Sequence, residues 1–179
     1  MSEFRSIRPE ELSGNPFSLI GSDWMLVTCA DPGESFDGGK NYNTMTASWG
    51  GMGILWEKPV AFVFIRPQRH TFAFAERNDR MTLSFFGPEH KAALAFCGSK
   101  SGRDFDKAKE CGLTPVSDSG PCGRAVWFEE AKIVLKTRKL YAKPFDPAAF
   151  LDEDARGCYR DDDFHTAYAA EIEEILVKD

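Results

Sequence analysis

The sequence predicts a mainly β domain with a few short flanking helices, and three stretches carry that prediction. Residues 43–49 (NTMTASW) alternate between short hydroxyl-bearing and apolar side chains, which is the period of a strand with two unlike faces. Residues 60–65 (VAFVFI) form a continuous apolar run, which is typical of a strand buried on both faces. Residues 81–86 (MTLSFF) alternate again and indicate a further strand.

Length and composition limit the possible architectures and partners. With 179 residues and 42% hydrophobic side chains, the chain has the size of one domain and can bury a full core. Its 15 Phe and four Trp residues suit both the interior of a barrel and contact with a flat ligand. The formal net charge of −6 argues against a surface that binds nucleic acid.

Several features missing from the sequence set expectations about location and chemistry. The first residues lack the apolar stretch of a signal peptide, and no apolar run is long enough to span a bilayer. We therefore expect a cytoplasmic protein without a membrane partner. The five cysteines are scattered, odd in number and without a C-x-x-C pair, which argues against a zinc or redox-dithiol site. We expect free thiols and no bound metal.

Local signals place most of the remaining elements. Residues 1–15 are polar and are expected to form an N-terminal arm with little structure, ahead of one domain over residues 16–179. Residues 31–42 are dense in Gly and acids, and residues 113–123 in Pro, Gly and small polar residues, so both are predicted loops. Residues 143–159 are predicted to leave the body as an excursion. Further strands are predicted at residues 22–29, 125–140 (one strand, or two with a turn) and 164–177.

Short helices are predicted where start and stop signals bracket a segment. Pro88 suits a first helical turn and Gly98 a C-terminal stop, while Gly112 ends a second candidate. The last segment is ambiguous, because AAEIEEIL has helical propensity. The predicted helices span residues 72–78, 88–97 and 101–111.

The strand at residues 43–49 carries a row of hydroxyl groups. Thr44, Thr46 and Ser48 would share one face, a pattern that suits hydrogen bonds to a ring with many donors and acceptors. The same face could equally be the solvated side of an edge strand. The glycines that follow are expected to break the strand and to let the backbone approach a neighbouring group closely; they are Gly50, Gly51 and Gly53.

The buried strand at residues 60–65 runs into a basic segment. Arg66 and Arg69 lie at its end, and no acidic residue occurs between Lys58 and Ala75, so the segment indicates an anion site. Thr71 could cap the following helix and place free N–H groups beside the same anion. The alternative is that both arginines are ordinary solvated charges at the rim of the fold.

Four motifs resemble one family in combination. They are NTMTASW, KPVAFVFIRPQRHT, SFF at residues 84–86 and GSKSGRDFDK at residues 98–107. Together they are similar to the flavin reductase-like, FMN-binding split-barrel proteins, and within them to the flavoredoxin-like branch, over residues 16–177. The resemblance implies an antiparallel Greek-key split barrel and a homodimer with FMN at the subunit seam. The H-x-x-Y-x-x-E-I pattern near the C-terminus is similar to the closing strand of these barrels, which decides the ambiguous segment in favour of a strand.

The resemblance also assigns roles to residues. The strand from Thr44 to Ser48 would give backbone and hydroxyl contacts to the flavin, and the segment after the buried strand would hold the phosphate. His165 is the catalytic candidate, because some relatives place a histidine near the nicotinamide, although a lone histidine is more often structural. The residues implied to bind the cofactor are Thr44, Met45, Thr46, Ala47, Ser48, Arg66, Gln68, Arg69, Thr71, Ser84, Phe85, Lys100 and Lys107.

Four of these assignments keep an open alternative. Ser84 and Phe85 would lie around the flavin and the dimer seam, but simple core packing explains them equally well. Lys100 and Lys107 would turn toward the phosphate, but nearby acidic residues partly neutralise them, so they could belong to a solvated helix.

The expected mechanism needs little from the protein beyond binding and orientation, because the cofactor carries the chemistry. This explains why the sequence shows no catalytic dyad. The sequence also lacks a GxGxxG motif, so NAD(P)H would bind without a Rossmann unit. The favoured function is an NAD(P)H-dependent flavin reductase. The alternatives are an FMN electron carrier reduced by a redox protein partner and, more distantly, a haem-binding or structural member of the same barrel class.

Overall fold

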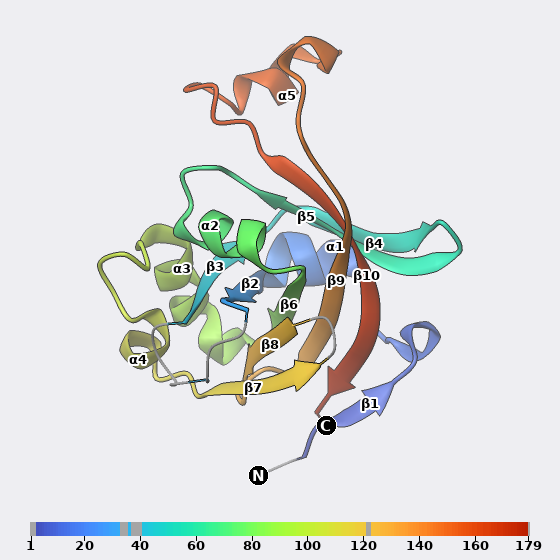
Figure 1. Ribbon diagram of the computed structural model, residues 1–179, viewed down its shortest axis with the longest axis vertical. Helices are drawn as coiled ribbons and strands as arrows, with labels where there is room; N and C mark the ends of the chain where they lie inside the picture. The colour runs from blue at the N-terminus through green and yellow to red at the C-terminus, as the bar shows by residue number, and fades with distance from the viewer. Residues whose placement is uncertain (1–2, 33–35, 37–40, 121–122, 179) are drawn as a thin grey trace.

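The computed structural model describes residues 3–32, 36, 41–120 and 123–178, and antiparallel β-structure dominates it (Figure 1). Eight strands form one sheet and two form a separate hairpin, which confirms the prediction of a mainly β, antiparallel domain. In order across the large sheet the strands are β3 (Tyr42–Ala47), β2 (Met25–Ala30), β6 (Arg80–Phe85), β9 (Ile133–Pro144), β10 (Thr166–Val177), β5 (Lys58–Ile65) and β4 (Gly50–Leu55), with β1 (Arg5–Ile7) on β10; the hairpin is β7 (Pro115–Gly120) and β8 (Gly123–Phe128).

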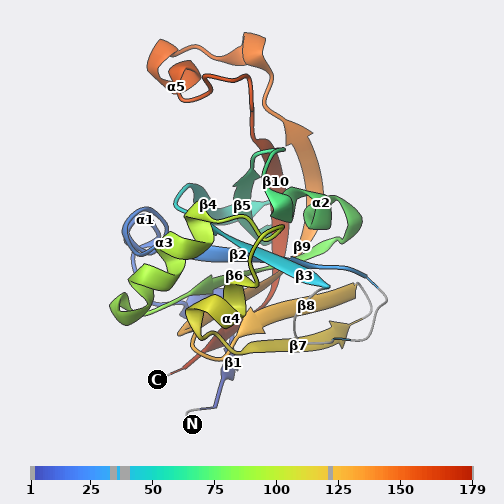
Figure 2. The same cartoon turned by 90° about the vertical axis from the view of Figure 1, so that its left-hand side faces the viewer.

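The two ends of the large sheet are neighbours in the chain. Strands β3 and β4 are outermost in the order, yet only Ser48 and Trp49 separate them. The sheet therefore has to curl until its two ends approach each other, as the two views show (Figures 1 and 2). Among the described residues no ladder joins β3 to β4, so the barrel is not closed by hydrogen bonds. The candidate site lies at this opening.

Short helices flank the sheet, as predicted. The helix predicted at residues 72–78 is α2, and the one predicted at residues 88–97 is the 3₁₀ turn η3 followed by α3. None of the described helices is long and apolar enough to cross a membrane. The helical segments are η1 (Pro9–Glu11), α1 (Pro16–Ser18), the π-helical turn η2 (Leu19–Asp23), α2 (His70–Arg77), η3 (Pro88–His90), α3 (Lys91–Ser99), α4 (Lys107–Cys111), η4 (Pro147–Ala149) and α5 (Glu153–Gly157).

The curled sheet separates two hydrophobic cores. In β2, Met25 and Val27 pack into the inner core, whereas Leu26 packs into the outer core beneath α3, α4 and β8. This two-sided packing explains why the strand is buried along its whole length. Tyr168 of β10 is the largest completely buried side chain of the described part, and it fills the inner core.

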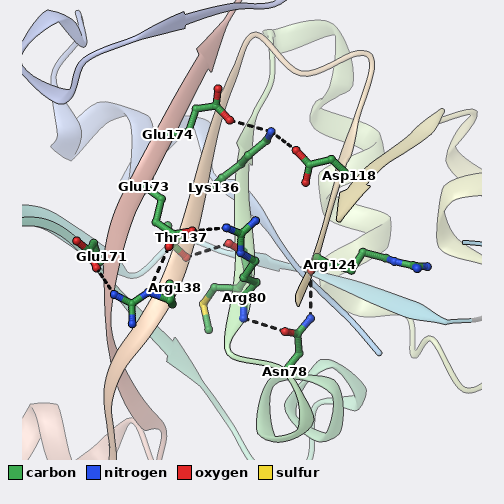
Figure 3. Close-up of polar contacts among 11 residues, drawn as sticks. Asn78, Arg80, Asp118, Arg124, Lys136, Thr137, Arg138, Glu171, Glu173 and Glu174 are labelled. Atoms are coloured by element: carbon green, nitrogen blue, oxygen red, sulfur yellow. Dashed lines mark hydrogen bonds and ion pairs between the residues drawn. The ribbon is translucent and has the colours of Figure 1, made fainter. Parts of the chain in front are cut away.

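A charged network crosses the strands β6, β9 and β10 (Figure 3). Arg138 contacts Glu171 at 2.5 Å and Glu173 at 3.2 Å, and Arg80 contacts Glu173 at 2.7 Å. The register between β9 and β10 shifts between Ile172 and Glu174, so Glu173 lies at an irregularity in the ladder. Partly exposed ion pairs contribute about 0–1 kcal/mol each, so we infer that the network mainly fixes the register.

The structure confirms the strands predicted in the C-terminal part of the chain. The segment predicted at residues 164–177 is β10, so the helical propensity of AAEIEEIL is overridden by pairing on both sides of the strand. The segment predicted at residues 125–140 is two strands, β8 and β9, separated by a turn. The excursion predicted at residues 143–159 contains η4 and α5 and projects from the body in both views (Figures 1 and 2).

The N-terminal arm, expected to have little structure of its own, contains one short strand that pairs with the body of the domain. Strand β1 pairs with β10, with Arg5 opposite Val177 and Ile7 opposite Ile175. Strand β5 covers only the first half of β10, from Thr166 to Glu171, and β1 covers the last three residues of the same edge, from Ile175 to Val177. An uncovered edge strand would be open to intermolecular pairing, which gives a physical reason for this contact.

The expectation that glycines interrupt the sheet is wrong. The glycine-rich segment forms β4, which pairs with β5 in a regular antiparallel ladder. At Gly50 an added Cβ would lie 2.8 Å from the carbonyl oxygen of Phe62, so the close approach of the strands requires glycine there. The hairpin turns at Trp56 and Glu57, both at positive φ (53° and 59°), which matches a type I′ turn.

Two further segments differ from the sequence prediction. The loop predicted at residues 113–123 contains β7, whose pairing with β8 outweighs its poor strand composition. Of the helix predicted at residues 101–111, only α4 forms, with Asp106 as its N-cap. At Gly102 an added Cβ would lie 1.8 Å from Oδ1 of Asn43, so the preceding loop packs closely against β3. The loop predicted at residues 31–42 lies largely outside the described residues.

Candidate functional site

A pocket of about 270 Å³ opens where the ends of the curled sheet meet. It is built from the last residues of β3, the connection to β4, the end of β5, the segment before α2 and the residue before β10. Most of the residues predicted to bind a cofactor come together here. The lining residues are Met45, Thr46, Ala47, Ser48, Trp49, Phe64, Arg66, Gln68, Arg69 and His165.

A second, more apolar cavity of about 510 Å³ continues from this pocket. The two cavities share Ser48, Trp49 and Phe64, and the second also contacts Phe17 and Phe145. Phe17 and Trp49 are exposed large apolar side chains. Exposed aromatic side chains beside a polar pocket are typical of a binding surface for a flat ring.

Strand β3 presents backbone groups at its free side. The carbonyl oxygen of Thr44 accepts hydrogen bonds from Lys107 Nζ at 2.8 Å and from Asn43 Nδ2 at 3.3 Å, so it points away from β2. Backbone groups alternate in direction along an antiparallel strand, so those of Thr46 also point away from β2. The edge strand can therefore offer an N–H and a C=O to a planar ligand in the pocket.

Two of the three hydroxyl groups predicted to face a ligand form hydrogen bonds within the protein instead. The Thr44 hydroxyl is buried and lies 2.9 Å from the Thr28 hydroxyl, and the Thr46 hydroxyl donates to the carbonyl of Leu94 at 2.5 Å. The predicted alternation is correct, but the hydroxyl face packs against α3. Thr46 and Ser48 line the pocket, whereas Thr44 lies beyond it. For Thr46, the backbone groups are thus better placed for a ligand than the side chain.

Arg66 and Gln68 converge on one carboxylate just beyond the excursion. Arg66 Nη1 lies 2.5 Å from Asp163 Oδ2, and Gln68 Nε2 donates to the same oxygen. Arg66 Nη2 donates to the carbonyl of Cys158 at 3.1 Å, and its guanidinium lies over the ring of Tyr159. The Arg66 guanidinium and the Gln68 amide hold the pKa of Asp163 below its usual value. The sequence did not reveal Asp163, because it lies 97 residues from Arg66.

Arg69 forms the other half of the basic segment. Its Nη2 donates to the carbonyl of Gly98 at 2.7 Å, and burial, with Arg66 nearby, lowers its pKa. Arg69, not Thr71, is the N-cap of α2, so the predicted capping role of Thr71 is wrong. Thr71 is fully buried within the first turn and accepts a hydrogen bond from Asn43 Nδ2 at 2.6 Å. That bond ties α2 to β3.

His165 lies at the wall of the pocket, and Tyr159 contacts it from the excursion. The Tyr159 hydroxyl and His165 Nδ1 are 2.8 Å apart, and the His165 ring lies 5.4 Å from that of Trp49. Burial, helped by the positive charge of Arg66, lowers the pKa of His165 to about 4, so its imidazole is neutral at neutral pH. Because a phenol donates well to a neutral imidazole nitrogen, we infer that Tyr159 donates to Nδ1 and that His165 carries its proton on Nε2. Tyr159 is a positioning residue that the sequence did not reveal.

The low pKa of His165 predicts a pH-dependent stability. The unfolded chain binds this proton near pH 6.5, before the folded chain does, so folding stability is fully present above 6.5 and lost as the pH falls toward 4. The loss attributable to His165 should be about 3 kcal/mol, and His165→Gln should remove it. Urea unfolding measured across this range tests the prediction, with His90→Gln as the control. If the free energy of unfolding of His165→Gln falls as steeply with pH as that of the parent, the prediction is contradicted.

The other predicted residues lie outside this pocket. Ser84 and Phe85 belong to β6 and are buried, with Phe85 in the inner core. Lys100 is exposed, and its ammonium lies 5.8 Å from the centre of the Phe105 ring. Lys107 is buried, donates to the carbonyls of Thr44 and Cys97, and has a pKa lowered to about 8 by burial. It lines a separate pocket of about 300 Å³ on the other side of the site.

Comparisons with known proteins identify a family for this chain and a shared fold. The chain matches the model of the flavin reductase-like domain over residues 17–177, and no curated protein matches it in sequence. Flavoredoxin of Desulfovibrio vulgaris (Miyazaki F) has a TM-score of 0.64 at 21% identity, over 87% of this chain and 69% of that one. An FMN-binding domain of a flavin reductase-like enzyme from Shewanella baltica OS155 has a TM-score of 0.65 at 13% identity, over 99% and 78%.

A third structure is the FMN-binding protein from Thermus thermophilus with bound p-hydroxybenzaldehyde. Its TM-score is 0.63 at 19% identity, over 98% of this chain and 82% of that one. At these identities the solved structures establish a shared fold. The family model covers nearly the whole chain, and on that ground the chain belongs to the flavin reductase-like family.

Proposed function

We propose that this chain binds FMN in the pocket between β3 and β5 and transfers a hydride to it from NAD(P)H. The observation that carries the proposal is the convergence, in one pocket, of an edge-strand backbone, aromatic side chains and two guanidinium groups. The names of the similar structures from Shewanella baltica and Thermus thermophilus include FMN binding, which supports this choice of flavin.

The donors and acceptors of the pocket fit the parts of FMN. The outward backbone groups of Thr46 suit the polar edge of the ring, and Trp49 with Phe64 suits its apolar faces. Arg66 and Arg69 suit a phosphate dianion, because charge-assisted hydrogen bonds to phosphate are stronger than neutral ones. The lowered pKa of Arg69 reflects burial beside another cation, and a bound anion would relieve that cost.

The residues of the chain orient the reactants and hold protons in place. When bound, FMN supplies the hydride acceptor, so the protein needs no strong acid or base. Neutral His165 presents an Nε2–H donor, fixed by the hydrogen bond from Tyr159 to its Nδ1. The cavity that contacts Phe17 and Trp49 is large and apolar enough for a second flat ring. We assign the nicotinamide to this cavity, with His165 as the candidate catalytic residue.

Anaerobic mixing tests the electron donor. The FMN-loaded protein should lose the visible absorbance of its flavin on addition of NADH or NADPH without any partner protein. His165→Gln should slow this reduction while leaving FMN affinity close to that of the parent. If the flavin absorbance stays constant with both nicotinamides but falls with dithionite, the protein is not a nicotinamide-dependent reductase. The alternative, an FMN electron carrier reduced by a protein partner, would then be favoured.

We also propose that the chain functions as a homodimer. Several large apolar side chains are exposed on the β4–β5 hairpin and beside the pocket, which is typical of an interaction surface. Light scattering at micromolar concentration should give twice the mass of one chain. The substitution Trp56→Lys should lower the measured mass. A monomer that carries a full complement of flavin would contradict the proposal. The side chains concerned are Phe17, Trp49, Ile54 and Trp56.

A further inference from the structure

The contact between Arg66 and Asp163 links the candidate phosphate site to the excursion. Asp163 lies two residues before His165, between β10 and the excursion at residues 143–159 that projects from the sheet in both views (Figures 1 and 2). Arg66 lines the flavin pocket, and it also lines a cavity of about 660 Å³ that contains Asp163, Glu153 and Asp154. Its guanidinium therefore lies at the boundary between the pocket and an acidic segment of the same chain.

The Asp163 carboxylate is incompletely satisfied. Its Oδ2 accepts hydrogen bonds from Arg66 and Gln68, while its Oδ1 is buried and has no hydrogen-bond partner in the described part of the chain. An arginine–carboxylate pair of full strength would use both oxygens in two parallel bonds. A phosphate group offers three strong acceptor oxygens and a larger negative charge, so it can engage the same donors more completely.

We propose that Asp163 is an internal competitor for the flavin phosphate and thereby sets the affinity for phosphate-bearing flavin. The inference rests on the proposed FMN site. Without ligand, the carboxylate neutralises Arg66 and occupies the donors of Arg66 and Gln68. When a phosphate arrives, these donors leave the carboxylate, and part of the binding energy is spent on breaking that contact. Riboflavin has no phosphate, so its binding is independent of Asp163.

The test measures the affinities of FMN and riboflavin by fluorescence quenching in the flavin-free protein and in Asp163→Asn. The variant keeps the shape of the side chain and one acceptor oxygen, but it removes the charge and replaces the second oxygen with an NH2 donor. FMN should bind about tenfold more tightly to Asp163→Asn, while riboflavin should bind as it does to the parent. Asp161→Asn is the control, because it removes the same charge two positions away without touching the Arg66 contact, and it should leave both affinities unchanged.

The outcomes separate this inference from the proposed function. Weaker FMN binding in Asp163→Asn would overturn the inference alone, because it would show that the carboxylate orients Arg66 for the phosphate. A parallel change for both flavins, or an equal gain in Asp161→Asn, would also overturn it. A parent protein that binds neither flavin would overturn the proposed function and this inference together. Thermal unfolding of each variant verifies that all three proteins are folded.

Discussion

Replacing Arg66 or Arg69 with alanine should weaken FMN binding by about tenfold to a hundredfold and leave riboflavin almost unaffected. A charge-assisted hydrogen bond contributes on the order of 1.5–3 kcal/mol, which gives that range. The effect of Arg69 should be the larger of the two. Arg66 already holds a carboxylate that the phosphate must displace, whereas Arg69 donates to the neutral carbonyl of Gly98.

Titration of both flavins into the flavin-free variants measures this effect. Arg77→Ala is the matched control, because Arg77 lies on α2 but pairs with Asp31, outside the pocket. A parallel loss of affinity for both flavins would indicate damage to the fold, and no loss at all would mean that the phosphate lies elsewhere. The pocket that Arg103 and Lys107 line together with Asp104 and Asp106 would then be the next phosphate site to test.

Replacing Tyr168 with alanine should lower the free energy of unfolding by about 3–5 kcal/mol, as expected for a large aromatic side chain lost from a well-packed core. Tyr168 is fully buried in the inner core, and its hydroxyl donates to Glu76 at 2.7 Å. Tyr168→Phe should cost only about 1 kcal/mol, because it removes the hydrogen bond and keeps the ring. The difference between the two variants measures how tightly the curled sheet packs.

Urea unfolding of these variants provides the measurement. Tyr141→Ala is the control, because Tyr141 lies on the neighbouring strand β9 but is about half exposed. It should change stability far less than Tyr168→Ala. A cost below about 1 kcal/mol for Tyr168→Ala would mean that the interior of the sheet is not packed as described.

The strands that could be predicted are those whose own residues carry the signal. The apolar run of β5 and the alternation of β3 identify these strands without tertiary information. Strands β1, β4 and β7 were missed because pairing defines them. Arg5–Ile7 is polar, Gly50–Leu55 is rich in glycine and Pro115–Gly120 has the composition of a turn. Only their long-range ladders show that they are strands.

The candidate site was predictable in outline and not in detail. The basic segment and the strand before the glycines both reach the pocket, because they lie at the ends of adjacent structural elements. The Thr44 hydroxyl contacts Thr28 of β2, and the Thr46 hydroxyl contacts the Leu94 carbonyl of α3. Both directions depend on tertiary packing, which local sequence does not encode. Asp163 and Tyr159 come from a distant segment, so no spacing in the sequence relates them to Arg66 or His165.

The most direct test of the central proposal is the structure of the protein crystallised with FMN. Density for the flavin ring is expected beside residues 46–49, near Trp49 and His165, and density for the phosphate within hydrogen-bond distance of Arg69. Arg66 should then contact the phosphate and no longer Asp163. Flavin density at another surface, or a pocket that stays free of flavin at saturating FMN, would contradict the proposal.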